Sequence, residues 1–249
     1  DSPILDFIEP KLYVSQNSSV FGQFTYGTEH NLQIQTLVDS FSYNNFAGKE
    51  SSFFLDSHKP ENDSIFETNV HINNSLFFID RVAHVENSNI EALWKKDTIH
   101  FSSHFKQNNR SNTANLIGKV ALNNEKISLN FIESDLNLLK EQWIFEKNNQ
   151  IDFFQDSIAF NNFNINYNNQ KIGLEGSFGK DSSNALFFVI DKFNLQNLKK
   201  ISDIDLNGLV NSKMSIENLK NKQLLKGTIL IEELALSLIH ISEPTRLGM

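Results

Sequence analysis

Apolar and polar residues alternate along most of the chain, which is the pattern of β-strands that bury one face. Ile127, Leu129 and Phe131 alternate with Ser128 and Asn130. Further runs place apolar residues at every second position: Ile99 and Phe101; Phe163, Ile165 and Tyr167; Ile172 and Leu174; Leu186, Phe188 and Ile190; Leu32 and Ile34; Val70 and Ile72. The pattern predicts an all-β chain.

Short polar connectors separate these runs and predict tight turns, because Asn tolerates left-handed backbone and bonds its own main chain. The predicted turns are Asn73 with Asn74, Lys96 with Asp97, Asn123 with Asn124, Asn148 with Asn149, and Lys180 with Asp181. Residues 58–63 and 107–113 are predicted to be longer loops. Turns this short join antiparallel neighbours, so the simplest topology is a long antiparallel β-meander.

Helix is expected in only two short segments. Residues 2–8 begin with a Ser cap and a Pro in the first turn. Residues 195–201 fit one or two amphipathic turns. In addition, residues 162–165 (NFNI) and 192–195 (KFNL) repeat one cassette thirty positions apart. This loose repeat favours a stack of similar strands over a closed globule.

The composition fits strands and excludes several classes of function. The chain has 22 Phe but only 2 Met and 4 Pro, and aromatic and β-branched residues suit a pleated surface. It has no Cys, which excludes disulfides and thiolate chemistry and fits an oxidising compartment. The net charge is −8 and the basic residues are scattered, so nucleic-acid binding is not expected.

No pattern of catalytic or metal-binding residues stands out. His100 and His104 lie on one predicted strand, where residues four apart are about 13 Å from each other, too far to share a metal ion. Both are expected to be exposed. No nucleophile elbow, phosphate loop, metalloprotease helix or EF-hand is present. We therefore expect no catalytic residue, no metal, no cofactor and no enzyme.

The apolar face itself is the remaining candidate site. A sheet this long has to bury that face, either against a second layer or by curling on itself. A second layer gives a closed core without a ligand, which composition alone favours. A curled sheet that stays partly open gives a long apolar trough.

Both ends of the chain have unusual features. Residues 236–249 begin with LSLIHISEPTR, which matches the translation of a sequencing adapter, so they are predicted not to be native. The chain begins at Asp1 without an initiator Met or a signal peptide. Residues 1–235 are therefore expected to be a fragment that is truncated at both ends.

Several segments together resemble the TamB-like translocation and assembly module proteins of Bacteroidota, within the AsmA-like superfamily. The resemblance rests on the order and spacing of degenerate β-motifs and covers nearly all of residues 1–235, with a departure at Gln223 and Leu224, where Pro is common. The motifs are residues 142–151 (QWIFEKNNQI), 157–165 (SIAFNNFNI), 169–176 (NQKIGLEG), 193–198 (FNLQNL), 206–211 (LNGLVN) and 224–227 (LLKG), and upstream 7–12 (FIEPKL) and 21–24 (FGQF).

The resemblance implies an elongated β-meander curled into an open apolar groove in the periplasm. It implies an inner-membrane anchor through an N-terminal helix outside this sequence, a β-barrel partner of the outer-membrane assembly family, and a role in phospholipid transport and outer-membrane protein assembly. Phospholipid acyl chains would then lie against Ile99, Phe101, Ile127, Leu129, Phe131, Phe163, Ile165, Ile172, Leu174, Leu186, Phe188 and Ile190.

Two alternatives remain. One is a closed β-sandwich or solenoid module of a surface protein that binds glycans, which predicts exposed aromatic platforms and a sealed core. The other is a structural spacer without a ligand.

Overall fold

The computed structural model describes residues 11–61, 65–79, 83–107, 111–138, 140–180, 185–200, 206–219 and 222–236. Within them the chain is almost entirely β. The strands are β1 Leu12–Val14, β2 Ser19–Thr25, β3 His30–Tyr43, β4 Phe46–Lys59, β5 Glu67–Ile79, β6 Ala83–Lys95, β7 Thr98–Gln107, β8 Thr113–Leu122, β9 Ile127–Phe131, β10 Asp135–Leu138, β11 Glu141–Phe145, β12 Gln150–Phe153, β13 Ser157–Tyr167, β14 Gln170–Gly179, β15 Ala185–Asn194, β16 Leu206–Leu219 and β17 Lys222–Leu236. One 3-10 helix, η1 Leu195–Lys200, precedes β16.

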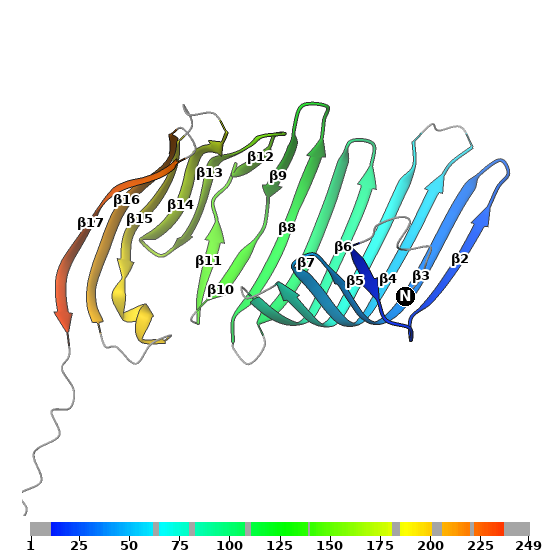
Figure 1. Cartoon of the computed structure of the whole chain (residues 1–249), viewed down its shortest axis with the longest axis horizontal. Helices are drawn as coiled ribbons and strands as arrows, with labels where there is room; N and C mark the ends of the chain where they lie inside the picture. The colour runs from blue at the N-terminus through cyan, green and yellow to red at the C-terminus, as the bar shows by residue number, and fades with distance from the viewer. Residues whose placement is uncertain are drawn as a thin grey trace, which may run out of the picture.

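All seventeen strands belong to one antiparallel sheet, in which most strands pair with their neighbours in sequence. The strands stand side by side along the long axis of the molecule (Figure 1). The predicted elongated antiparallel meander is therefore confirmed.

Three positions in the sheet are occupied by two short strands placed end to end. β1 and β2 share one edge of β3. β9 and β10 share one edge of β8, and β11 and β12 share one edge of β13. β9 also pairs with β12, and β10 with β11, so the sheet stays continuous. Each such position, whether one strand or two occupy it, is here called a rung. Because three rungs hold two strands each, the seventeen strands make fourteen rungs. A spacing of about 4.8 Å between rungs gives the sheet a length on the order of 60 Å.

At the breaks in the two middle rungs, two polar side chains form the hydrogen bonds that a neighbouring strand's backbone would otherwise form. The side chain of Asn149 accepts the N–H of Phe131 at 2.9 Å and donates to the carbonyls of Phe131 and Glu146 at 2.8 and 2.6 Å. The Ser134 hydroxyl accepts the N–H of Ile117 and donates to its carbonyl, both at 2.8 Å. Asn149 is only 1% exposed and Ser134 only 4% exposed, so both side chains are held within the sheet at these contacts.

Left-handed residues bend five alternate members of the sheet. Glu50, Asn87, Asn162, Lys192 and Glu233 lie inside β4, β6, β13, β15 and β17 with φ between 47° and 53°. The pairing register shifts beside four of them, as in β-bulges, which bend a strand and increase its twist.

The bulges also explain the repeated cassette. Asn162 and Lys192 are its first residues, and each takes the left-handed conformation immediately before an inward Phe. The recurrence therefore marks two equivalent bulges thirty residues apart in the chain.

One predicted turn is wrong, and another is present but does not form the expected hairpin. Asn73 and Asn74 lie inside β5, where Asn74 donates to the Ser88 hydroxyl on the next strand at 3.0 Å. Asn148 and Asn149 separate β11 from β12, which follow one another in a single rung instead of forming a hairpin. Asn has a high turn propensity, but here a cross-strand amide bond and the broken rung decide the outcome.

Other predictions about connections hold or lie outside the described residues. The turns at Lys96 with Asp97 and at Asn123 with Asn124 are present, and η1 occupies the second predicted helical segment. The predicted loop at residues 58–63 starts later, because β4 continues to Lys59. The predicted helix at residues 2–8 and the segment after Leu236 lie outside the described residues, as does Asp181 of the turn that follows β14.

The outermost strands are apolar on both faces. Val20, Phe21 and Phe24 of β2 are 64–70% exposed, and Leu225 and Ile229 of β17 are 65% and 64% exposed. Within the described residues β2 pairs only with β3, and β17 pairs only with β16. Long apolar edge strands are sites where further strands add.

Replacing Asn149 with Ala should destabilise the fold by about 2–4 kcal/mol, because three part-buried backbone groups lose their partners. Asn149→Asp should also destabilise, since a carboxylate has no proton to donate to the Phe131 and Glu146 carbonyls. Urea unfolding measures the change, and Asn124→Ala in an exposed turn is the matched control. A loss in Asn149→Ala no larger than in the control would refute the role of this side chain.

Candidate functional site

The pairing register places all twelve candidate residues on one face of the sheet, here called the inner face. Cross-strand partners form rows that run from strand to strand. One row runs through Ile99, Val120, Leu129, Ile151, Phe160, Gly176 and Leu186. Parallel rows on the same face contain Phe101 with Phe131, Ile127 with Phe153, Phe163 with Leu174 and Phe188, and Ile165 with Ile172 and Ile190. The alternation of the sequence thus grouped all twelve on one face of the sheet.

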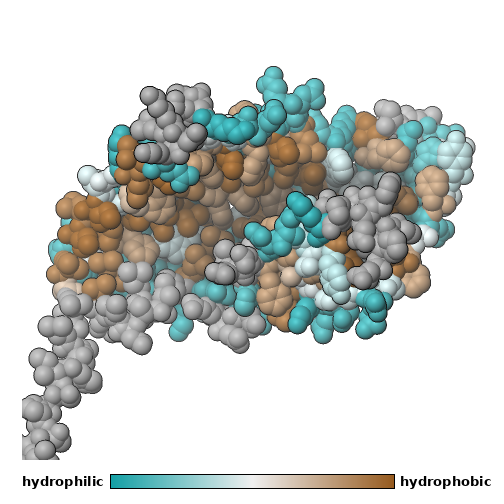
Figure 2. Space-filling view, viewed as in Figure 1, coloured by the Kyte–Doolittle hydropathy of each residue, from teal (hydrophilic) through white to brown (hydrophobic). Residues whose placement is uncertain are grey.

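The inner face is hollowed and apolar. Figure 2 shows brown side chains gathered in a depression that runs along the molecule between more polar borders. Eleven of the twelve residues are half-buried, and Ile127 is 45% exposed. No second sheet covers this face among the described residues. Of the apolar residues described, only Val85, Trp143, Phe145, Ile151 and Leu195 are fully buried.

Aromatic rings pack together in the middle of the inner face, beside the broken rungs. The rings of Phe131 and Phe145 stack with centroids 4.6 Å apart, and Phe163 meets Phe145 edge-on at 5.7 Å. Phe101 meets Phe131 edge-on at 6.1 Å. Such pairs add about 0.5–1.5 kcal/mol each beyond the area they bury, so this cluster links rungs on both sides of the break.

The absence of a side chain at Gly118 leaves room for the Phe101 ring on the inner face. A Cβ at position 118 would lie 2.7 Å from Cζ of Phe101 and 2.2 Å from the carbonyl oxygen of Asn130. Any side chain here would push against the neighbouring backbone as well as the ring. The absence of a side chain at 118 therefore lets the aromatic ring lie flat across the adjacent strand.

The inner-face residues that sequence reasoning missed include Trp143, Phe145, Ile151 and Phe160. Trp143, Ile144 and Phe145 form a continuous apolar run in a strand of only five residues, so no alternation marks which of them point inward. Phe160 lies on the same face as Phe163 because the bulge at Asn162 adds a residue between them. Strict alternation would have placed Phe160 on the opposite face.

A polar row interrupts the apolar surface on β4, β5 and β6. Ser51, Asn74 and Ser88 lie side by side there and are 7%, 5% and 2% exposed. Asn74 donates to Ser88, while the Asn74 Oδ1 and Ser51 Oγ atoms have no hydrogen-bond partner among the described residues. The inner face is therefore less uniformly apolar toward the β4–β6 end than around Phe131.

The opposite face, here called the outer face, is held together by polar contacts centred on Asp152. Its Oδ1 atom accepts the Ser128 hydroxyl at 2.6 Å and the Gln150 amide at 2.8 Å, and its Oδ2 atom lies 3.0 Å from the Lys126 ammonium. Burial opposes ionisation of Asp152, but hydrogen bonds from Ser128, Lys126 and Gln150, with the charge of Lys126, outweigh it and hold its pKa below the usual value.

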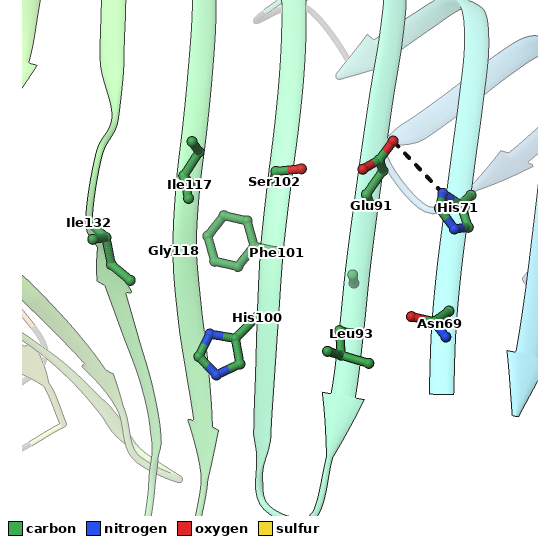
Figure 3. A pocket seen from close by; sticks show the side chains of 11 residues that line it. Asn69, His71, Glu91, Leu93, His100, Phe101, Ser102, Ile117, Gly118 and Ile132 are labelled. Carbon is green, nitrogen blue, oxygen red and sulfur yellow. Dashed lines mark ion pairs between the residues drawn. The ribbon is translucent and has the colours of Figure 1, made fainter. Parts of the chain in front are cut away.

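A shallow pocket of about 310 Å³ also lies on the outer face, between β5 and the β9–β10 junction (Figure 3). Its polar side includes His71, whose Nδ1 atom is 3.9 Å from Glu91, and His100; its apolar side includes Leu93 and Ile117.

His100 and His104 are predicted to be exposed side chains. Both are exposed, as expected, and His104 bonds Asn115 at 2.7 Å. The described residues contain no group of three or more His, Cys, Asp or Glu side chains that would hold a metal ion.

Comparison with known proteins does not assign the chain to a family. No protein-family model, no curated protein and no solved structure matches it. Within the described part of the chain, no helix is long and apolar enough to cross a membrane.

Acid should weaken the fold partly through Asp152. Because its folded pKa lies below the unfolded value of about 3.9, its contribution is fully present above that value and is lost as pH falls through the folded pKa. We expect Asp152→Asn to lower the free energy of unfolding by on the order of 1–3 kcal/mol at pH 7, and the difference from wild type to shrink below about pH 4. Urea unfolding at pH 7 and below pH 4 measures both effects.

The control is Glu133→Gln, which neutralises an exposed carboxylate. A difference between wild type and Asp152→Asn that stays constant over the same pH range would contradict the role given to the Asp152 charge.

Proposed function

We propose that this chain is a segment of a TamB-like bridge of the bacterial cell envelope, which shields lipid acyl chains on its inner face for phospholipid transport between membranes and for outer-membrane protein assembly. The observation that carries the proposal is the long, largely apolar inner face of a single-layered sheet. Such a surface suits the storage or passage of a hydrocarbon chain and offers no constellation of residues for catalysis, so we propose a function without enzymatic activity.

The energetics of lipid transfer favour this reading. Each acyl CH₂ group exposed to water costs about 0.8 kcal/mol, so an unshielded two-chain lipid crosses an aqueous compartment only slowly. The sheet extends on the order of 60 Å, several times the roughly 15 Å depth of one membrane leaflet. Phe, Ile and Leu along its whole length would lower the barrier without a cofactor.

The partners in this proposal come from the resemblance described under Sequence analysis. They are an inner-membrane anchor outside this sequence and a β-barrel protein of the outer-membrane assembly family. The proposed location is the periplasm, with which the absence of Cys from the chain is consistent.

One observation favours the alternative of a glycan-binding surface module. Phe24 and Tyr26 are 64% and 80% exposed near the end of β2, and the Tyr26 and His30 rings lie 4.7 Å apart. Exposed rings of this kind suit stacking against sugar rings. The half-exposed inner face argues against the sealed core that this alternative requires.

Photo-crosslinking in a Gram-negative periplasm tests the proposed function. A photoreactive residue placed at Phe163, Leu174 or Phe188 should capture phospholipid, because these side chains share the inner face. The same residue at Glu175, which is exposed on the outer face one position from Leu174, should capture at least about tenfold less, since acyl chains avoid a hydrated surface. Mass spectrometry of the adducts measures both.

Asn164 is a less suitable outward control than Glu175. Its side chain is 9% exposed and donates to Glu146 and to Asn162. If the folded chain yields no lipid adduct at any of the three inward positions, the lipid role is excluded for this segment, and the glycan-binding or spacer reading replaces it.

A further inference from the structure

A second depression opens at the border of the inner face, between the β4–β5 connection and the β6–β7 turn. It has a volume of about 480 Å³ and is lined by Ser57, Ile65, Phe66, Thr68, Trp94 and Lys96. Phe66 and Trp94 are 50% and 46% exposed. This depression is here called the rim pocket.

The rim pocket is continuous with the inner face. Trp94 pairs with Thr68 on one side and with Ile99 on the other, and Ile99 begins the row that leads through Val120 to Leu129. The indole N–H of Trp94 donates to the carbonyl of Lys96 at 2.9 Å, which holds the ring against the β6–β7 turn. An apolar chain lying along Ile99 would therefore end beside the Trp94 ring.

Positive charge lies at the mouth of this pocket. The Lys59 ammonium is 5.9 Å from the centroid of the Phe66 ring, and Lys96 lines the pocket itself. Among the described residues neither lysine has a carboxylate partner, whereas neighbouring Lys95 pairs with Glu67. The Asp97 carboxylate, next to Lys96, accepts the Thr98 hydroxyl.

Hydroxyl groups complete the polar side of the rim pocket. The Ser57 and Thr68 hydroxyls lie 2.8 Å apart and form one hydrogen bond with each other, which leaves further donor and acceptor capacity. The pocket thus combines aromatic surface and two hydroxyls with Lys96 in its lining and the Lys59 ammonium near the Phe66 ring. This combination fits a molecule that is apolar at one end and anionic at the other.

We propose that the rim pocket binds the phosphate-bearing headgroup of a lipid whose acyl chain lies on the inner face. The phosphate lies between Lys59 and Lys96, and the glycerol and ester groups lie against Ser57, Thr68 and the Trp94 ring. This proposal rests on the proposed function. It adds the substrate class, an anionic phospholipid, and the border of the groove along which its headgroup is held.

Tryptophan fluorescence of the full chain reports on this pocket. The chain has 2 Trp residues, and Trp143 is only 3% exposed, so Trp94 gives most of the response to a ligand at the surface. The probe is dihexanoyl phosphatidylglycerol below its micelle concentration. Saturable binding should shift the emission to shorter wavelength, and the shift should vanish in Trp94→Phe.

The charge requirement is tested in the same titration. The double variant Lys59→Gln, Lys96→Gln should weaken binding about three- to tenfold, the effect of losing two partly exposed ion pairs. Lys119→Gln, which removes an exposed lysine from the outer face, is the control and should bind as wild type does. Glycerol 3-phosphate and monomeric octyl glucoside separate the anion from the apolar contribution, and each alone should bind more weakly.

Several outcomes would refute the proposal that the rim pocket binds a lipid headgroup. They are an emission shift that persists in Trp94→Phe, equal affinity in the double lysine variant and wild type, or binding of either partial ligand as tight as that of the phospholipid. Photo-crosslinking at Phe163 distinguishes the two proposals. If lipid is captured there but Trp94 fluorescence does not respond, only the proposed headgroup binding in the rim pocket is refuted. If neither lipid capture nor a Trp94 response is seen, the proposed lipid role is refuted as well.

Discussion

A single-layered sheet has no second layer to cover its apolar face, and the rest of this structure follows from that constraint. The hydrophobic effect still favours removal of Phe, Ile and Leu from water. The chain meets this demand by packing side chains against each other across the same face, as in the cluster of Phe131, Phe145 and Phe163. Only five of the described apolar residues become fully buried, and the others remain partly or largely exposed. A closed domain of this size would not leave so much apolar surface partly accessible.

Curvature makes such self-packing possible, and it depends on local features of the backbone. The left-handed residues in β4, β6, β13, β15 and β17 bend alternate members of the sheet. In the middle, the paired breaks between β9 and β10 and between β11 and β12 interrupt two successive rungs. Asn149 and Ser134 keep the hydrogen-bond ladder intact across these breaks. Because the aromatic cluster lies beside them, the continuity of the inner face depends on two small polar side chains.

The sequence predicted the class of fold and the composition of the inner face, because alternation directly encodes which side of a strand is buried. All twelve candidate positions share one face for this reason. Alternation fails where the backbone departs from regular strand geometry. Phe160 was missed because the bulge at Asn162 shifts the period, and Asn149 was read as a turn residue although it substitutes for a strand backbone. Neither effect is visible in the identity of the residue alone, since Asn serves in turns, bulges and buried hydrogen bonds alike.

The proposed function depends on whether a lipid reaches the inner face while the sheet is folded. Because the chain has no Cys, single cysteines at Leu174 and Glu175 would report separately on the inner and outer faces. The measurement is the rate of maleimide labelling of each cysteine in the folded chain, before and after loading with phospholipid. The account predicts that both react in the lipid-free chain and that lipid slows labelling at 174 by at least about tenfold while leaving 175 unchanged, since only an accessible thiol reacts. A cysteine at 174 that is unreactive without lipid, or that labels at the same rate with and without it, would contradict the account.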